Sequence, residues 1–194
     1  MAFTTGLGGI STWGPSFLNR AYGLSNADAS TFFAFGWASA RCAGVLLGGW
    51  IGSAWRRRSF LAYPLIITIG STLTAPVLFA AFFGQNRTAS QGFILLEIFF
   101  TSLCFGSINA LLIETVPVAQ RSAASAIFVI CAYGLSNVIS ADLIGAISAK
   151  QNLRVGMLIA PTAFLLSAFL LLTYTLLPRR RASIEIPTTG LASA

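Results

Sequence analysis

The sequence predicts an all-α, polytopic membrane bundle of six transmembrane helices. Of its 194 residues, 56% are hydrophobic and only 9% are charged, whereas a soluble domain carries about 25% charged residues. The hydrophobic residues form six runs, separated by short polar or basic segments. Because a bilayer accepts apolar side chains on every face of a helix, a membrane is the solvent that fits this composition.

The charge and the side-chain chemistry argue against several other classes of protein. The net charge is +7, but the basic residues lack the basic helix face or aromatic platform of a nucleic-acid-binding protein. The chain has no histidine, and its cysteines lie inside apolar runs without metal-ligand spacing: Cys42, Cys104 and Cys131. We therefore predict no nucleic-acid partner, no metal, no cofactor and no catalytic residue, and we do not expect an enzyme.

Each apolar run predicts one membrane-spanning helix, because about 20 helical residues cross the hydrocarbon core. The first run, 2–18, is barely long enough and contains Pro15, so we expect this first helix to be truncated. The other five runs cover residues 29–54, 60–83, 92–113, 123–147 and 155–177. Because Pro178 and three arginines end the last run, we predict a transmembrane bundle at 1–177 and a disordered cytoplasmic tail at 178–194.

The distribution of lysine and arginine between alternate loops predicts the orientation, because positively charged loops stay on the cytoplasmic side. With both termini inside, the inner set of seven basic residues is Arg56, Arg57, Arg58, Arg121, Arg179, Arg180 and Arg181. The outer set of four is Arg20, Arg87, Lys150 and Arg154. The sequence therefore predicts an integral, multi-pass membrane protein with cytoplasmic termini.

Small residues recur every four positions in the second apolar run, at Ala40, Gly44, Gly48 and Gly52. This spacing places them on one helix face, where they allow another helix backbone to approach closely. Two interpretations are open for this face. It forms either an ordinary tight contact between helices or a surface on which helices slide during a functional cycle.

The stretch 49–58 resembles a loop motif of the major facilitator superfamily, in which a glycine precedes an acidic residue and then basic residues. It reads Gly49-Trp50-Ile51-Gly52-Ser53-Ala54-Trp55-Arg56-Arg57-Arg58, with Ser53 in the acidic position. Six spans with both ends inside also resemble the second half of that superfamily. The resemblance implies helices seven to twelve of a transporter whose two halves enclose a midplane substrate site. The missing N-terminal six-helix half would belong to the same full-length chain or to a second subunit.

Two further segments resemble spinster-type transporters within that superfamily. Trp13-Gly14-Pro15-Ser16-Phe17-Leu18 is similar to the signature that closes their seventh helix. Val116-Pro117-Val118-Ala119-Gln120-Arg121-Ser122-Ala123-Ala124-Ser125-Ala126 is similar to their loop into the eleventh helix.

The spinster resemblance implies secondary active transport of an amphiphilic or organic anion by alternating access, with a sphingolipid or lysophospholipid type of substrate. Two alternatives stay open. The chain belongs either to an organic-anion or sugar-acid:proton symporter of another major facilitator family, or to a non-transporting six-helix membrane subunit. The plasma membrane and an endolysosomal membrane both stay open as locations.

Arg41 is the foremost candidate for contact with substrate. It lies about midway along the second apolar run, and a charge near the bilayer centre costs at least ~2.5 to 3.5 kcal/mol on insertion scales. We therefore expect it to face the protein interior or an aqueous cavity. There it either contacts an anionic head group or supports the fold by bonding to carbonyl and hydroxyl groups.

Glu97, in the fourth run, is a candidate site of proton coupling, with a water-exposed carboxylate near the interface as the alternative. Asp142, near the outer end of the fifth run, is either a solvated end residue or a cavity residue. Asn109, Tyr133 and Asn137 are able to hydrogen-bond a substrate or to bridge helices.

The inner loops contain a second group of candidates, which concern gating rather than substrate binding. Glu114 and Arg121 flank the loop before the fifth run, where they form either a gate salt bridge or a solvated loop. The full set of loop-motif and gating candidates is Gly49, Ser53, Arg56, Arg57, Arg58, Glu114 and Arg121.

Overall fold

A computed structural model describes residues 2–59, 61–150 and 152–176. The predicted all-α class is confirmed for these residues, since every regular element among them is helical. The elements are α1 (Ala2–Tyr22), α2 (Asn26–Arg56), α3 (Ala62–Phe83), α4 (Arg87–Thr115), η1 (Val118–Gln120), α5 (Arg121–Val129), η2 (Ile130–Leu135), α6 (Ser136–Lys150), α7 (Leu153–Met157) and α8 (Ile159–Leu176). The predicted tail at 178–194 lies outside the described residues.

Five described segments are long and apolar enough to cross a membrane: α2, α3, α4, the continuous segment Val118–Lys150 and Leu153–Thr173. α1 is less apolar, but its 21 residues would reach about 30 Å as a helix. The described residues therefore form a bundle of five to six long helices, and the count of six spans stays a prediction.

The helix ends follow from local sequence. The side chain of Ser25 accepts a hydrogen bond from the backbone N–H of Asp28 at the start of α2, and Asn86 caps α4 in the same way through Thr88. Between α1 and α2, Gly23 adopts φ of 67°, a left-handed conformation that glycine adopts at no steric cost. The two caps and the glycine turn allow each helix to begin a few residues after the previous one ends, so the connections at these places are short.

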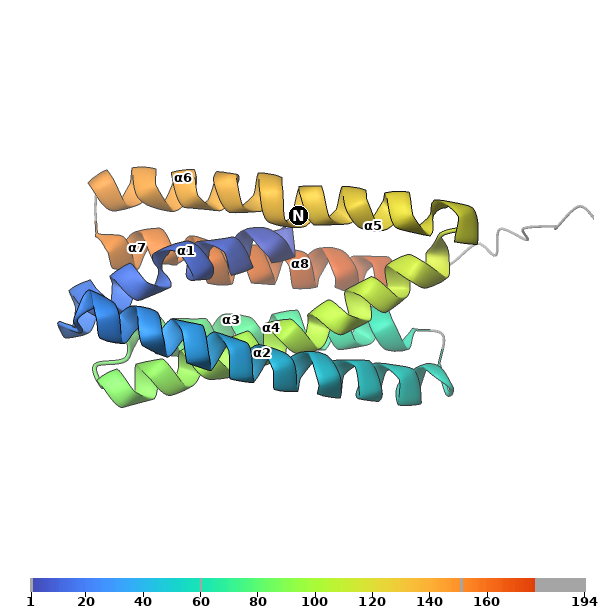
Figure 1. The fold of residues 1–194 in the computed structure, drawn as a ribbon, viewed down its shortest axis with the longest axis horizontal. Helices are drawn as coiled ribbons and strands as arrows, with labels where there is room; N and C mark the ends of the chain where they lie inside the picture. The colour runs from blue at the N-terminus through green and yellow to red at the C-terminus, as the bar shows by residue number, and fades with distance from the viewer. Residues whose placement is uncertain (1, 60, 151, 177–194) are drawn as a thin grey trace, which may run out of the picture.

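The long helices lie side by side along the bundle, and α4 crosses the others obliquely (Figure 1). α3 packs against both α4 and α8, α2 packs against α4, and α1 packs against α6 and α8. α3 is the most buried of the candidate spans. It therefore forms much of the core, while α2 and the segment Val118–Lys150 leave most of their surface uncovered.

The small-residue face of α2 packs directly on α4, as its spacing predicts. Gly44, Gly48 and Gly52 are all buried. A Cβ atom added at Gly44 would lie 2.6 Å from the carbonyl oxygen of Phe99, and one added at Gly48 would overlap the backbone of Leu103. Helix backbones come this close only where no side chain intervenes. Sliding at this face stays a prediction.

The close approach gives a stability test with a matched control. We expect Gly48→Ala to lower the free energy of unfolding by about 1–3 kcal/mol, because the added methyl group forces α2 and α4 apart. Gly49→Ala makes the same chemical change on the same helix, but its Cβ meets nothing within 4 Å. Denaturing-detergent titration of the purified proteins measures both. Equal effects of the two substitutions would refute the tight contact.

The fifth predicted span is one continuous helix that contains a π-helical segment, η2, between α5 and α6. The last span begins with the five-residue α7, which is separated from α8 at Leu158. π-Helical segments often occur at functional sites, and η2 carries Tyr133, one of the predicted site residues.

Candidate functional site

Arg41 lies at the centre of α2, about 22 Å from either end of the helix. Its guanidinium group is held by three side chains that come from α2, α4 and η2. The guanidinium Nη2 donates a hydrogen bond of 3.0 Å to the hydroxyl of Tyr133. Its Cζ atom lies 5.4 Å from the ring centre of Trp37 and 5.5 Å from that of Phe105. We refer to Arg41, Trp37, Phe105 and Tyr133 as the Arg41 cluster.

The Arg41 cluster keeps a positive charge among aromatic rings without neutralising it. The ring centres of Phe105 and Tyr133 are 5.8 Å apart, so the two rings support each other as well as the guanidinium group. Stacking of a cation over aromatic faces is worth about 0.5–2 kcal/mol, and one hydroxyl hydrogen bond uses only one of the five guanidinium N–H groups. Arg41 is only partly buried, so donors remain for an anion that approaches from the open side.

Glu97 lies about two turns before Phe105 on α4, and none of its surface is exposed. Neither carboxyl oxygen has a hydrogen-bond partner among the described residues. The hydroxyl of Thr101 donates instead to the backbone carbonyl of Glu97 at 3.0 Å. The structure therefore places Glu97 in the interior and not at a wet interface.

The remaining predicted cavity residues divide into two groups. Asn109 donates a hydrogen bond of 3.0 Å to the carbonyl oxygen of Phe105, so it lies one turn from the Arg41 cluster. Asn137 faces α1 instead, where its side-chain oxygen would overlap a Cβ atom added at Gly8. Asp142 is exposed on α6. The structure thus places Asn109 one turn after Phe105, Asn137 against α1 and Asp142 on the exposed surface of α6.

The end of the bundle that carries Arg56 and Glu114, which the charge pattern predicts to be the inner end, contains a salt bridge between these two loop residues. Nε of Arg56 lies 2.9 Å from Oε2 of Glu114, which joins the ends of α2 and α4. Arg121 donates through Nε to the carbonyl oxygen of Val116 at 3.3 Å. Glu114 therefore pairs with Arg56 across helices. Arg121, at the start of α5, is hydrogen-bonded to the backbone of the loop that precedes this helix.

Ser53, in the acidic position of the loop motif, donates its hydroxyl to the carbonyl oxygen of Trp50 on its own helix. The carboxylate that pairs with Arg56 of this stretch comes from Glu114 on α4. Gly49 is exposed. Ser53, Arg57 and Arg58 line a surface pocket of about 370 Å³ together with Trp50 and Ala54.

The salt bridge at the inner end is partly exposed, at 27% for Arg56 and 39% for Glu114. We expect a coupling free energy of only about 0.2–1 kcal/mol in a double-mutant cycle, because water screens such pairs. The cycle combines Arg56→Gln with Glu114→Gln and measures unfolding by denaturing-detergent titration. Arg57→Gln combined with Glu114→Gln is the control and should be additive. Additive behaviour of the Arg56 pair as well would contradict the structure.

Sequence reasoning identified Tyr133 but missed the other two aromatic members of the Arg41 cluster. Trp37 lies four residues before Arg41, a spacing that puts both on one helix face, so this neighbour was visible in the sequence. Phe105 lies on a different helix, and only the crossing of α4 over α2 brings it to the guanidinium group. No local pattern indicates such a contact.

Comparison with curated proteins finds two frog relatives. The chain is 29% identical over 161 residues to protein spinster homolog 1 of Xenopus tropicalis. The aligned region covers 76% of this chain and 30% of that protein. The chain is 30% identical over the same length, with the same coverage, to protein spinster homolog 1 of Xenopus laevis. The chain thus spans about 30% of the length of these relatives. No protein-family model matches the chain.

The relatives confirm the resemblance that the motifs at 13–18 and 116–126 predicted. Together with the apolar helices, they establish an integral, multi-pass membrane protein.

Proposed function

Because the chain resembles spinster-type proteins of the major facilitator superfamily, we propose that it forms the C-terminal six-helix half of a secondary active transporter. In this proposal α1 to α4 are helices seven to ten. The segment Val118–Lys150 is helix eleven, and α7 with α8 is helix twelve. The substrate is an amphiphilic anion, and alternating access moves it across the membrane.

The observation that carries the proposal is the Arg41 cluster. A cation at the centre of a membrane helix is energetically costly, so it is found mainly where it has strong partners or serves a function. Arg41 has aromatic partners and one hydroxyl group, but no salt bridge among the described residues. This environment suits a ligand that brings both a negative charge and apolar surface, which is the chemistry of an amphiphilic anion.

Glu97 supports coupling of transport to protons. A buried carboxyl group without hydrogen-bond partners is unfavourable for stability alone, so a role in the transport cycle is a reasonable cause of its presence. Glu97 lies on α4, the helix whose Phe105 contacts Arg41. In this proposal substrate and proton therefore influence each other through α4.

Reconstitution tests the proposal. The purified chain alone is expected to give no saturable uptake in liposomes, because alternating access requires a second bundle around the substrate. Addition of the N-terminal half of a spinster-type protein should restore uptake of a fluorescent lysophospholipid but not of radiolabelled gluconate, a sugar acid. Saturable uptake by a demonstrated monomer of this chain would overturn the division into halves. Uptake of gluconate alone would favour the organic-acid symporter.

A further inference from the structure

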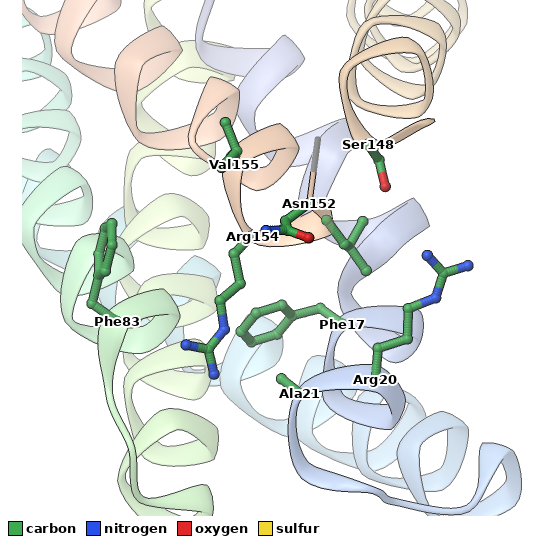
Figure 2. A pocket seen from close by; sticks show the side chains of 9 residues that line it. Phe17, Arg20, Ala21, Phe83, Ser148, Asn152, Arg154 and Val155 are labelled. Carbon is green, nitrogen blue, oxygen red and sulfur yellow. The ribbon is translucent and has the colours of Figure 1, made fainter. Parts of the chain in front are cut away.

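A pocket of about 550 Å³ opens at one end of the bundle, away from the Arg41 cluster. It lies between the end of α1, the end of α3 and the turn from α6 to α7 (Figure 2). Its lining residues are Phe17, Arg20, Ala21, Phe83, Ser148, Asn152, Leu153, Arg154 and Val155. The predicted orientation puts this end of the bundle on the outer side of the membrane.

The apolar wall of this pocket is already formed by the packing of the bundle. Phe17 is buried and packs edge-to-face on Phe82, with 5.1 Å between ring centres. Leu153 is buried as well. In contrast, the ring of Phe83 is 62% exposed at the rim. The pocket therefore offers a fixed apolar wall and an apolar rim that continues onto the surface of the bundle.

Two arginines give the pocket a positive charge. Figure 2 shows Arg20 and Arg154 on opposite sides of the Phe17 ring. Both are exposed, and neither has a salt bridge within the described part of the chain. None of the described acidic residues, Asp28, Glu97, Glu114 and Asp142, lines the pocket. The side chains of Ser148 and Asn152 add neutral hydrogen-bonding groups to the lining of the pocket.

We propose that this pocket binds the phosphate head group of an anionic membrane phospholipid, whose acyl chains lie along the apolar rim. Arginine is the side chain best suited to a phosphate, because its planar fork donates two parallel hydrogen bonds. The exposed rim favours a lipid over free phosphate, since free phosphate gains nothing from Phe83 or Val155. The pocket is built from α1, α3, α6 and α7, whereas the Arg41 cluster comes from α2, α4 and η2. The site is thus separate from the proposed substrate path and does not depend on it.

Lipid titration of the purified 194-residue chain, followed by native mass spectrometry, tests this site. The probes are phosphatidylglycerol and phosphatidylcholine with identical acyl chains, with inorganic phosphate as a soluble competitor. We expect phosphatidylglycerol to bind about tenfold more tightly than phosphatidylcholine, since only the former has a net negative head group for both arginines. Higher salt should reduce this preference.

Matched variants locate the site. Arg20→Gln and Arg154→Gln should each lower the affinity for phosphatidylglycerol about threefold, and the double variant should abolish the preference. Arg87→Gln removes an exposed arginine that does not line the pocket, and it should leave the preference unchanged. Phe83→Ala should weaken both lipids. Thermal unfolding is expected to change little in all these variants, because the substituted side chains are exposed.

Three results would overturn the proposal. The first is a double variant that keeps the preference for phosphatidylglycerol. The second is an equal loss of preference in Arg87→Gln, which would show a general charge effect. The third is displacement of phosphatidylglycerol by an equal concentration of inorganic phosphate, which would assign the pocket to a soluble anion. If the double variant fails to fold, the two single variants decide the question by the same comparison with Arg87→Gln.

Discussion

Arg41→Gln is expected to lower the affinity of the complete transporter for its anionic substrate by about 10- to 100-fold, the effect of losing a charge-assisted hydrogen bond in a partly buried site. The glutamine side chain keeps some hydrogen-bonding capacity but has no charge. It also cannot engage the rings of Trp37 and Phe105 as a cation does. The measurement is a binding titration of a fluorescent lysophospholipid to the full-length protein in detergent.

Arg41→Lys separates charge from shape. The ammonium group keeps the charge but loses the planar fork, so we expect a smaller loss of affinity than for Arg41→Gln. Tyr133→Phe is the matched control within the cluster. It removes the hydroxyl that accepts from Arg41 but keeps the ring, so it should have the smallest effect. Wild-type affinity and transport in Arg41→Gln would refute the substrate role. Loss of thermal stability with normal binding in all variants would show that Arg41 only supports the fold.

Glu97→Gln and Glu97→Leu are expected to abolish uptake that is driven by a proton gradient, because neither side chain can take up and release a proton. Glu97→Leu should at the same time raise the free energy of unfolding by about 1–3 kcal/mol, since it removes a buried polar group that has no hydrogen-bond partner. Uptake is measured in liposomes with and without an imposed pH difference, and stability by denaturing-detergent titration.

Glu114→Gln is the control for Glu97. It neutralises a carboxyl group that is 39% exposed at the inner end of the bundle, so it should leave proton-driven uptake in place. Unchanged proton dependence in Glu97→Gln would remove Glu97 from the coupling mechanism. A loss of stability in Glu97→Leu would show that the carboxyl group is satisfied in the folded protein.

The membrane bundle was predictable because hydropathy and length alone determine where a helix crosses a bilayer. The predicted runs 29–54 and 92–113 lie inside α2 and α4, and the predicted run 60–83 matches α3 closely. The helices extend beyond the runs because polar capping residues such as Ser25 and Asn86 add turns that carry no hydropathy signal. The face of α2 that packs on α4 was also visible, since small residues at every fourth position indicate a close contact.

The candidate site was predictable only as single residues. Arg41 and Glu97 stood out because ionisable groups are rare within membrane spans. Their partners depend on how helices cross, and Phe105 and Tyr133 come from elements distant in sequence. The pairing of Glu114 with Arg56 rather than Arg121 has the same origin, because it depends on where the inner ends of α2 and α4 meet. The sequence therefore indicates which ionisable residues need an interaction partner, but it does not indicate which residue that partner is.

The π-helical segment at Ile130–Leu135 determines where this span tolerates a change of length. Its wide turn holds one residue more than an α-helical turn, so one residue fewer here would give an ordinary α-helix and leave α5 and α6 aligned. One residue fewer in the first turn of α6 would instead rotate the rest of that helix by about 100°. Ser140 and Ile144, now fully buried, would then leave their contacts in the bundle, and the backbone of Ala141 would lose its hydrogen bond from Trp13. Elsewhere, a surface loop tolerates a gained or lost residue. In this helix, a change of length by one residue outside the π-helical segment alters which side chains face the protein in the turns that follow.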